Sequence, residues 1–198
     1  TTALARLGAE VVDLGCLPDD ASAIQTALLA AAQTVDLVLT SGGVSVGDAD
    51  LVRQVVSQIG VIDSWRIFMK PGKPLAFGRI GTTPFIGLPG NPVSTFVTFF
   101  LFVRPALRVL AGSDAQINRA ALRLPLAQAW AAGDRPEFIR VRRAYAANGE
   151  TMLYPFANQN SGLLSSIAWA DGVALIPADQ MLECGAIVDY IPLEGWYL

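Results

Sequence analysis

Two short loops near the middle of the chain carry residue types that suit the binding of phosphate or another oxyanion. The first reads Lys-Pro-Gly-Lys-Pro and holds Lys70 and Lys73 in a proline-stiffened turn, although two solvated charges would give the same pattern. The second reads Pro-Gly-Asn-Pro-Val-Ser, with Asn91 and Pro92 where a helix N-cap and first turn are expected. Because free N–H groups and the helix dipole favour anions there, its candidate ligand-binding residues are Pro89, Gly90, Asn91, Pro92 and Ser94, although a stop-and-cap signal without a ligand would give the same pattern.

A third loop is rich in glycine and follows a continuous apolar segment at residues 36–40. It reads Ser-Gly-Gly-Val-Ser-Val-Gly-Asp, and glycine permits both left-handed backbone and close approach of a ligand. Successive N–H groups in such a loop can form a concave anion site. A tight strand-to-helix turn is an equally good interpretation, since neither the P-loop nor the dinucleotide motif is matched. The candidate residues are Ser41, Gly42, Gly43, Ser45 and Gly47.

Two carboxylates, Asp48 and Asp50, open the helix that should follow this loop. Asp48 is expected to cap the helix, whereas Asp50 either caps the helix and stabilises its dipole or holds a hard cation. The chain contains no histidine, and its two cysteines, Cys16 and Cys184, lack the spacing of metal ligands. Mg²⁺ on oxygen ligands is therefore the metal that we expect if a cation is bound, and the residues alone leave both roles of Asp50 open.

The composition of the chain excludes several classes of function. Without histidine there is no Ser-His-Asp or Cys-His catalysis. A net charge of −3 argues against sequence-independent binding of nucleic acid. Of the 198 residues, 53% are hydrophobic, so a sizeable core is expected, and the cysteines are expected to be reduced thiols of a cytoplasmic protein. No signal peptide is visible, and the apolar run at residues 96–103 is too short to span a bilayer.

The first part of the chain alternates predicted strands with predicted helices. Strands are expected at residues 9–14, 36–40, 61–69, 75–79 and 84–88, and helices at residues 21–33, from the glycine-rich loop to 59, and 92–110. Such alternation predicts an α/β fold with a parallel or mixed sheet and helices on both faces. Arg66 should share a strand face with Lys70 and extend its positive patch. Residues 1–8 read as the end of a helix, so we expect the sequence to be part of a longer protein.

The pattern changes after residue 110. Short alternating segments follow, at residues 122–126, 138–143, 152–156, 172–176 and 187–191, and Asn148 with Gly149 is a strong hairpin signal. We predict a small all-β domain, built as a partly closed barrel over residues 118–198, after an α/β domain over residues 1–112. Arg140 and Arg142 share one strand face, and the residues alone favour solvated side chains for both.

Three of these motifs together resemble the molybdopterin molybdenumtransferase family. The resemblance is carried by the glycine-rich loop from Ser41 with Asp50, by the turn at residues 70–74, and by Gly-Leu-Pro-Gly-Asn-Pro-Val-Ser from Gly87. It covers the whole chain, and the E domain of gephyrin is a eukaryotic relative of this family. The resemblance implies a molybdopterin-binding α/β domain that lacks its first strand, followed by a C-terminal β-barrel domain.

The resemblance also implies a reaction, the insertion of molybdenum into a pterin dithiolene. Adenylylated molybdopterin and molybdate would bind, Mg²⁺ would assist hydrolysis of the pyrophosphate bond with release of AMP, and the dithiolene sulfurs would take the metal. Asp50 would hold the cation, and Asp50, Lys70 and Lys73 would be the catalytic residues. Ligand contacts are implied for Arg66, Pro89, Pro92, Arg140 and Ser161. The family further implies a homodimer that uses neither nucleic acid nor membrane.

Two departures from the family pattern bear on activity. The family has two further N-terminal domains and a first strand with a Gly-Asp-Glu motif, and neither is found in this sequence. We therefore expect residues 1–198 alone to be inactive. Two other functions are kept as alternatives, namely the related molybdopterin adenylyltransferase step and a scaffold role with peptide binding, as in gephyrin.

Overall fold

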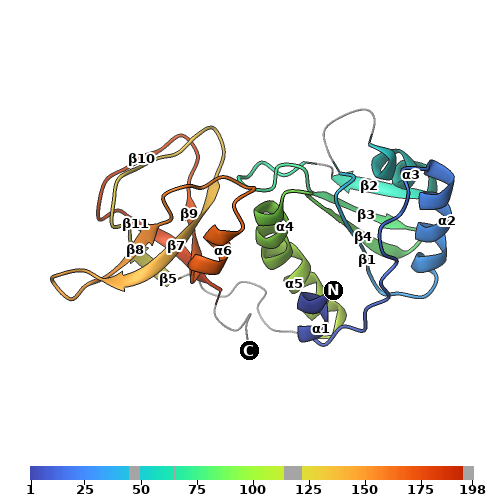
Figure 1. The fold of residues 1–198 in the computed structure, drawn as a ribbon, viewed down its shortest axis with the longest axis horizontal. Coiled ribbons are helices and arrows are strands. Elements are labelled where there is room, and N and C mark those ends of the chain that lie inside the picture. The colour runs from blue at the N-terminus through green and yellow to red at the C-terminus, as the bar shows by residue number, and fades with distance from the viewer. Residues whose placement is uncertain (45–49, 65, 114–121, 194–198) are drawn as a thin grey trace. The chain divides into compact units, whose positions relative to one another are not determined.

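The computed structural model describes residues 1–44, 50–64, 66–113 and 122–193, and it divides into two compact units (Figure 1). The first unit comprises residues 1–67 and 72–115, and the second comprises residues 68–71 and 116–198. The sequence predicts one boundary in a single linker, whereas four residues that include Lys70 belong to the second unit. The chain therefore passes between the units three times.

The first unit is built on a mixed sheet with the strand order β1-β4-β3-β2. Its strands are β1 (Val38–Ser41), β2 (Gly60–Ser64), β3 (Ala76–Ile80) and β4 (Thr83–Leu88). β1 pairs with β4 in parallel, and β3 pairs antiparallel with both β4 and β2. This confirms the predicted mixed sheet. The parallel pair also brings the carboxyl ends of β1 and β4 to one edge of the sheet.

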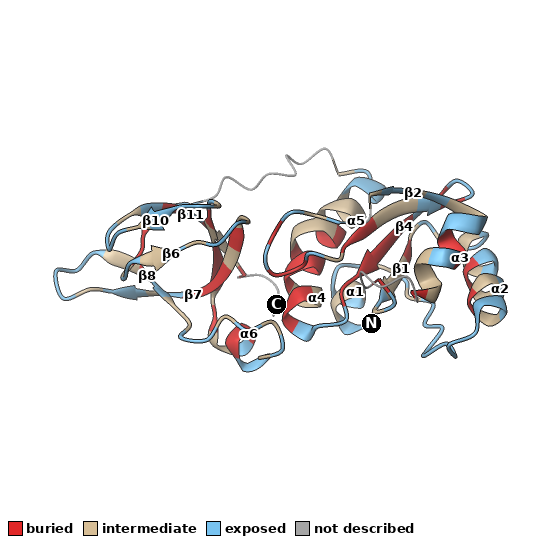
Figure 2. Cartoon of the chain, turned by 90° about the horizontal axis from the view of Figure 1, so that it is seen from above, coloured by how far each residue is buried: buried red, intermediate tan, exposed pale blue. Residues whose placement is uncertain are grey.

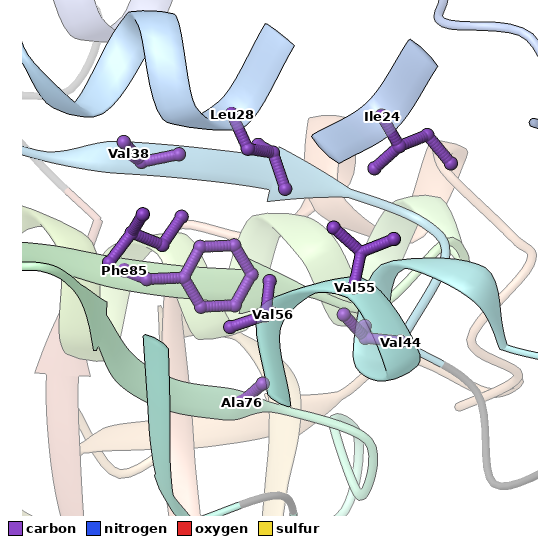
Figure 3. Close-up of a cluster of buried hydrophobic side chains, with 9 residues drawn as sticks. Ile24, Leu28, Val38, Val44, Val55, Val56, Ala76 and Phe85 are labelled. Carbon is purple, nitrogen blue, oxygen red and sulfur yellow. The ribbon is translucent and has the colours of Figure 1, made fainter. Parts of the chain in front are cut away.

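Two helices, α2 (Ala21–Ala32) and α3 (Leu51–Ile59), cover one face of this sheet. Figure 3 shows Leu28 of α2 and Val56 of α3 gathered with Phe85 of β4. Each of these three side chains is almost completely buried, so the cluster forms the hydrophobic core on this face.

A long helix covers the other face. It consists of α4 (Pro92–Thr98), a π-helical turn η1 (Phe99–Val103) and α5 (Arg104–Leu110). The ring of Phe102 packs edge-on against Phe77 of β3 with centroids 5.6 Å apart, whereas the adjacent Ala76 joins the first core cluster. Because successive strand residues point to opposite faces, helices lie on both faces of the sheet, as predicted.

The π-helical turn follows from a proline within the helix. Pro105 has no N–H, so the carbonyl of Leu101 loses the partner that it would have four residues later. The Arg104 N–H donates to the Phe99 carbonyl, five residues before it, which widens the turn. The helix thereby continues past the proline.

The helix from Pro92 to Leu110 has 19 residues with a mean hydropathy of 1.6, so by length and composition alone it could cross a membrane. Val93, Val97 and Phe100 are buried and recur every three or four residues, which marks one side of the helix. Burial of α4 and of the adjacent β4 is visible in Figure 2. This pattern, with the contact to the sheet, favours a core helix.

One predicted strand does not form, and another is shorter than predicted. Residues 9–14, which the structure describes throughout, form no strand and follow α1 (Thr2–Arg6) as a largely exposed segment. The Asp13 carboxylate accepts hydrogen bonds from Gly15 and Thr1, and such local bonds compete with strand pairing. The strand predicted over residues 61–69 ends at Ser64, just after a register irregularity.

The second unit is a curled antiparallel sheet with the strand order β5-β11-β9-β7-β8. Its strands are β5 (Leu122–Pro125), β7 (Glu137–Tyr145), β8 (Thr151–Pro155), β9 (Gly172–Ile176) and β11 (Ile187–Pro192). Leu126, just after β5, forms a parallel bridge with Leu153 of β8 and so joins the two edge strands. The sheet is a partly closed barrel, as predicted.

Smaller elements complete the second unit. β6 (Trp130–Ala131) pairs with β10 (Met181–Leu182), and α6 (Ser165–Trp169) packs against β7. The predicted hairpin joins β7 to β8, with Gly149 at a φ of +81°. Both cysteines are free and exposed, as expected of reduced thiols.

Candidate functional site

Two of the three predicted loops meet in the first unit, at the carboxyl ends of β1 and β4. Ser41 and Leu88 are partners in the parallel register, and the Gly42 N–H donates to the Leu88 carbonyl at 3.0 Å. A Cβ atom on Gly90 would lie 3.7 Å from the Gly42 Cα, which is ordinary van der Waals contact. The glycine-rich loop and the Pro-Gly-Asn-Pro loop are therefore direct neighbours, as parallel strand ends require.

Gly43 brings the same loop against the start of α3. It has a φ of +68°, and a Cβ atom there would lie 2.5 Å from Cγ2 of Val52 and 3.9 Å from Oδ1 of Asp50. Both the left-handed backbone and the lack of space therefore require glycine at this position. The loop and Asp50 form one local arrangement, which we call the loop–Asp50 site: residues 41–43, Asp50 and residues 89–92.

Asp50 is the N-cap of α3, which is one of the two roles that the sequence leaves open for this residue. Its side chain accepts a hydrogen bond from the Arg53 N–H at 3.1 Å and is buried at 8% exposure. Asp48, Ser45 and Gly47 lie outside the described residues. Within the described ranges no group of three or more acidic, histidine or cysteine side chains could hold a metal. A single carboxylate still fits Mg²⁺, which uses one or two carboxylates, waters and substrate phosphates.

The Pro-Gly-Asn-Pro loop is held by a side chain from the helix that follows it. Thr95 Oγ1 donates to the carbonyls of Pro89 and Asn91, the latter at 3.0 Å. Asn91 is the N-cap residue and Pro92 is the first helical residue, as predicted, although the Asn91 side chain makes no capping bond. Gly90 and Pro92 are exposed, whereas Ser94, a candidate donor to a ligand, is only 4% exposed.

The basic residues predicted beside these loops are divided between the units. Arg66 and Lys73 are exposed in the first unit, where the Ile67 N–H donates to the Lys73 carbonyl at 3.2 Å. The prediction that Arg66 and Lys70 share a strand face is wrong, because β2 ends at Ser64. The hydrogen bond between Ile67 and Lys73 closes a loop that carries Lys70 into the second unit.

Lys70 has an acidic partner that the sequence analysis misses. Its Nζ donates to Oε1 of Glu137 at 2.9 Å, and the lysine side chain is 50% exposed, whereas that of Glu137 is 5% exposed. Glu137 lies on the same face of β7 as the core residues Ile139 and Val141. A carboxylate at an apolar position of an alternating strand needs a partner. This position is the feature of the sequence from which a partner for Glu137 could have been predicted.

Arg140 is buried at 1% exposure, which contradicts the expectation of a solvated strand arginine. Its guanidinium donates to Ser166 Oγ at 3.1 Å and to the Asn160 carbonyl at 3.2 Å, and so contacts the peptide that precedes Ser161. Burial lowers the pKa of Arg140 to about 10, so the group stays charged near neutral pH. Gln159 supports the same region by bonding the backbone of Arg140 at 2.9 Å and 3.0 Å.

Comparison with known families assigns both units. Residues 1–109, more than half of the chain, match the family described as “Probable molybdopterin binding domain”. The chain belongs to this molybdopterin-binding family. Residues 123–193 match the “MoeA C-terminal region (domain IV)”, so the second unit of the molybdopterin-binding chain also has a known counterpart.

Several named proteins are similar to this member of the molybdopterin-binding family. A molybdopterin molybdenumtransferase of Haemophilus influenzae is 50% identical over 109 residues, 55% of this chain and 27% of the relative. The molybdenum cofactor synthesis protein cinnamon of Drosophila melanogaster is 38% identical over 180 residues, 90% of this chain and 30% of the relative. A molybdopterin molybdenumtransferase of Nostoc sp. is 37% identical over 195 residues, 87% of this chain and 41% of the relative. The chain thus spans well under half of each of these relatives.

A solved structure supports the two-unit architecture. The crystal structure of a molybdopterin biosynthesis MoeA protein from Pyrococcus horikoshii matches with a TM-score of 0.77 and 28% sequence identity. The match covers 98% of this chain and 46% of that protein. An α/β unit followed by a curled β unit therefore also occurs in that protein.

Proposed function

We propose that the full-length protein that carries this sequence is a molybdopterin molybdenumtransferase. It would insert molybdenum from molybdate into adenylylated molybdopterin, with Mg²⁺-assisted hydrolysis of the pyrophosphate bond and release of AMP. Family membership supports the pterin ligand, and the names of two relatives support the transfer. The observation that carries the proposal is the meeting of two anion-suited loops beside a buried carboxylate in the loop–Asp50 site.

The loop–Asp50 site suits a phosphate-containing ligand because its polar groups are mostly backbone. Gly42 and Gly43 both have positive φ, and Gly90 approaches Gly42 so closely that little side-chain bulk separates the loops. A ligand can therefore come close to backbone N–H groups, and the start of the helix at Asn91 adds its dipole. These groups would bind and orient the pyrophosphate before hydrolysis.

Asp50 is the residue that would hold Mg²⁺ at this site. Its carboxylate is already oriented by the Arg53 N–H and by its burial next to Gly43. When bound, the cation would neutralise the charge that develops on the leaving phosphate. Asp50 itself contributes a fixed negative group, and it does so without losing its role as helix cap.

Positive side chains would supply the remaining charge for the oxyanions. Lys73 and Arg66 are exposed in the first unit, and Lys70 is half-exposed in the second. Arg140 is a buried cation for which no ion pair is found among the residues that the structure describes. A buried cation without a carboxylate is costly to keep, and an anionic ligand such as molybdate or the pterin phosphate would compensate it.

The same proposal includes the setting in which the protein works. We propose a cytoplasmic homodimer whose partners are small molecules, with no nucleic-acid or membrane partner. The net charge of −3 argues against a nucleic-acid partner, and the contact of the most apolar helix with the sheet argues against a membrane partner.

The test is a reconstituted reaction with the full-length protein. Adenylylated molybdopterin, molybdate and Mg²⁺ are supplied, and AMP release and pterin-bound molybdenum are measured together. Both products should appear, and both should depend on molybdate and on Mg²⁺. A protein that binds the pterin but releases no AMP would contradict the proposal.

Two further assays with the same protein separate the alternative functions. Formation of adenylylated molybdopterin from ATP and molybdopterin would indicate the adenylyltransferase step instead. Capture of a receptor peptide without turnover would indicate a scaffold. Residues 1–198 alone remain predicted to be inactive, and molybdenum insertion by them would refute that prediction.

A further inference from the structure

Lys70 is fixed to the second unit through its backbone. Its N–H donates to the Pro136 carbonyl at 2.9 Å, and its carbonyl accepts from the Phe138 N–H at 2.7 Å. These bonds form a parallel bridge between Lys70 and Glu137 at the start of β7. The bridge places the two side chains next to each other.

The carboxylate of Glu137 is fixed as well. Oε1 accepts from Lys70 Nζ at 2.9 Å and from the Gly133 N–H at 3.4 Å, and Oε2 accepts from Trp130 Nε1 at 3.3 Å. Burial of a carboxylate is costly unless a cation and hydrogen-bond donors compensate it. Lys70 is the compensating cation here, so the acid and the ammonium hold each other in one geometry.

The ammonium remains accessible despite this contact. An ammonium has three N–H donors, and the Lys70 side chain is 50% exposed while it bonds Glu137. A free lysine loses about 2 kcal/mol of rotamer entropy when it is immobilised. Because the Lys70 side chain is already restricted by Glu137, part of that entropy is lost before any ligand binds. This raises the affinity for an anion at this position.

We propose that Glu137 is a positioning residue that holds the Lys70 ammonium for an oxyanion of the ligand. This inference rests on the proposed function for the identity of the ligand, although the geometry of the pair is independent of it. A purely electrostatic role makes the opposite prediction. A carboxylate beside an ammonium weakens the attraction for an anion, so its removal would then tighten binding.

The first experiment needs no ligand. Residues 1–198 contain two lysines, Lys70 and Lys73, so their labelled Cε groups can be distinguished by NMR. Lys70 should be restrained in the wild type and become as mobile as Lys73 in Glu137→Gln. Glu183→Gln removes an exposed carboxylate of the same unit and should leave both unchanged. Equal mobility of Lys70 in the wild type and in Glu137→Gln would overturn the proposal.

The second experiment measures kcat/KM for adenylylated molybdopterin in the full-length protein. Glu137→Gln should lower it about three- to tenfold, which corresponds to the cost of ordering one long side chain. Lys70→Gln should lower it at least as much, and the double variant should be no worse than Lys70→Gln alone. A gain in kcat/KM, no change, or a further loss in the double variant would contradict a positioning role.

A conservative variant keeps the test decisive if Glu137→Gln fails to fold. Glu137→Asp retains the charge and shortens the side chain by one carbon, so it should release Lys70 and lower kcat/KM in the same direction. If the wild type itself shows no turnover, the proposed function fails, while the mobility of Lys70 still decides whether Glu137 positions it.

Discussion

The two units hold their acidic groups in different ways. In the first unit, Asp50 is held by a backbone N–H at the start of a helix, beside a loop whose shape depends on glycine. In the second, Glu137 is held mainly by the side chains of Lys70 and Trp130, with a longer bond from the Gly133 N–H, and its charge is compensated by Lys70. Backbone placement follows from topology, whereas side-chain placement depends on each partner. Substitutions at the loop glycines of the first unit should therefore act through shape, whereas substitutions at Lys70 or Glu137 should act through charge pairing.

The largest effect is expected from Asp50→Asn in the full-length protein. Asparagine is as good an N-cap as aspartate, so α3 should stay intact while the negative charge is lost. Turnover with Mg²⁺ should fall about a hundredfold or more, because the cation loses its protein ligand. The matched control is Asp20→Asn, which changes the N-cap of α2 in the same way and should leave turnover unchanged. Equal turnover in both variants would remove Asp50 from the site.

Arg140→Met should separate binding from stability in the second unit. Methionine replaces a buried cation by an apolar side chain of similar length, but it leaves Ser166 Oγ and the Asn160 carbonyl without their donor, so the free energy of unfolding should fall by no more than about 1–3 kcal/mol. Loss of a charge-assisted contact should lower kcat/KM about ten- to a hundredfold. Arg123→Met, at an exposed arginine in a 3.8 Å ion pair, should change neither quantity. A large loss of stability would show that Arg140 serves the barrel rather than a ligand.

Gly43→Ala tests the shape dependence of the first unit. Alanine at a left-handed position costs about 1 kcal/mol, and the crowding by Val52 should add about 1 kcal/mol more. Gly81→Ala is the matched control, since Gly81 also has a positive φ but open space around its Cβ position. Chemical denaturation should therefore show the larger loss for Gly43→Ala. Equal losses would mean that the loop adjusts freely around Val52.

Lys73→Gln should have the smallest effect. Its ammonium is exposed, so its attraction for an oxyanion is screened by solvent and salt. Affinity for adenylylated molybdopterin should fall about threefold at low salt and hardly at all at high salt. Lys70→Gln should retain more of its effect at high salt, because Lys70 is held against a buried acid. An identical salt dependence in the two variants would remove the contrast between the lysines.

The sequence predicts the first unit well where position depends on backbone chemistry. The capping residues Asn91 and Pro92 give the start of one helix, and parallel strand ends predict that two loops meet. The strand predicted at residues 9–14 does not form because strand formation depends on a neighbouring strand, which a local apolar pattern does not specify. The N-cap at Asp50 is one of the two roles that the sequence leaves open for this residue, whereas Asp48 lies outside the described residues.

The second unit is predicted well in architecture and poorly in its charged residues. Alternation and the hairpin signal at Gly149 indicate an antiparallel barrel, but they do not reveal which polar side chains are buried. Arg140 is buried because α6 and the loop before it supply acceptors, and these segments come from more than 15 residues later in the chain. Pairing of Lys70 with Glu137 spans 67 residues, a separation at which local sequence patterns carry no information.

The short insertion of residues 68–71 has a consequence for how the protein can be dissected. A piece that begins at residue 116 would include Glu137 but leave out Lys70, and a buried acid would then have lost its counter-ion. Cutting the gene at the linker therefore does not yield a self-sufficient C-terminal module. Any exchange of this barrel between homologues must carry the distant tetrapeptide with it.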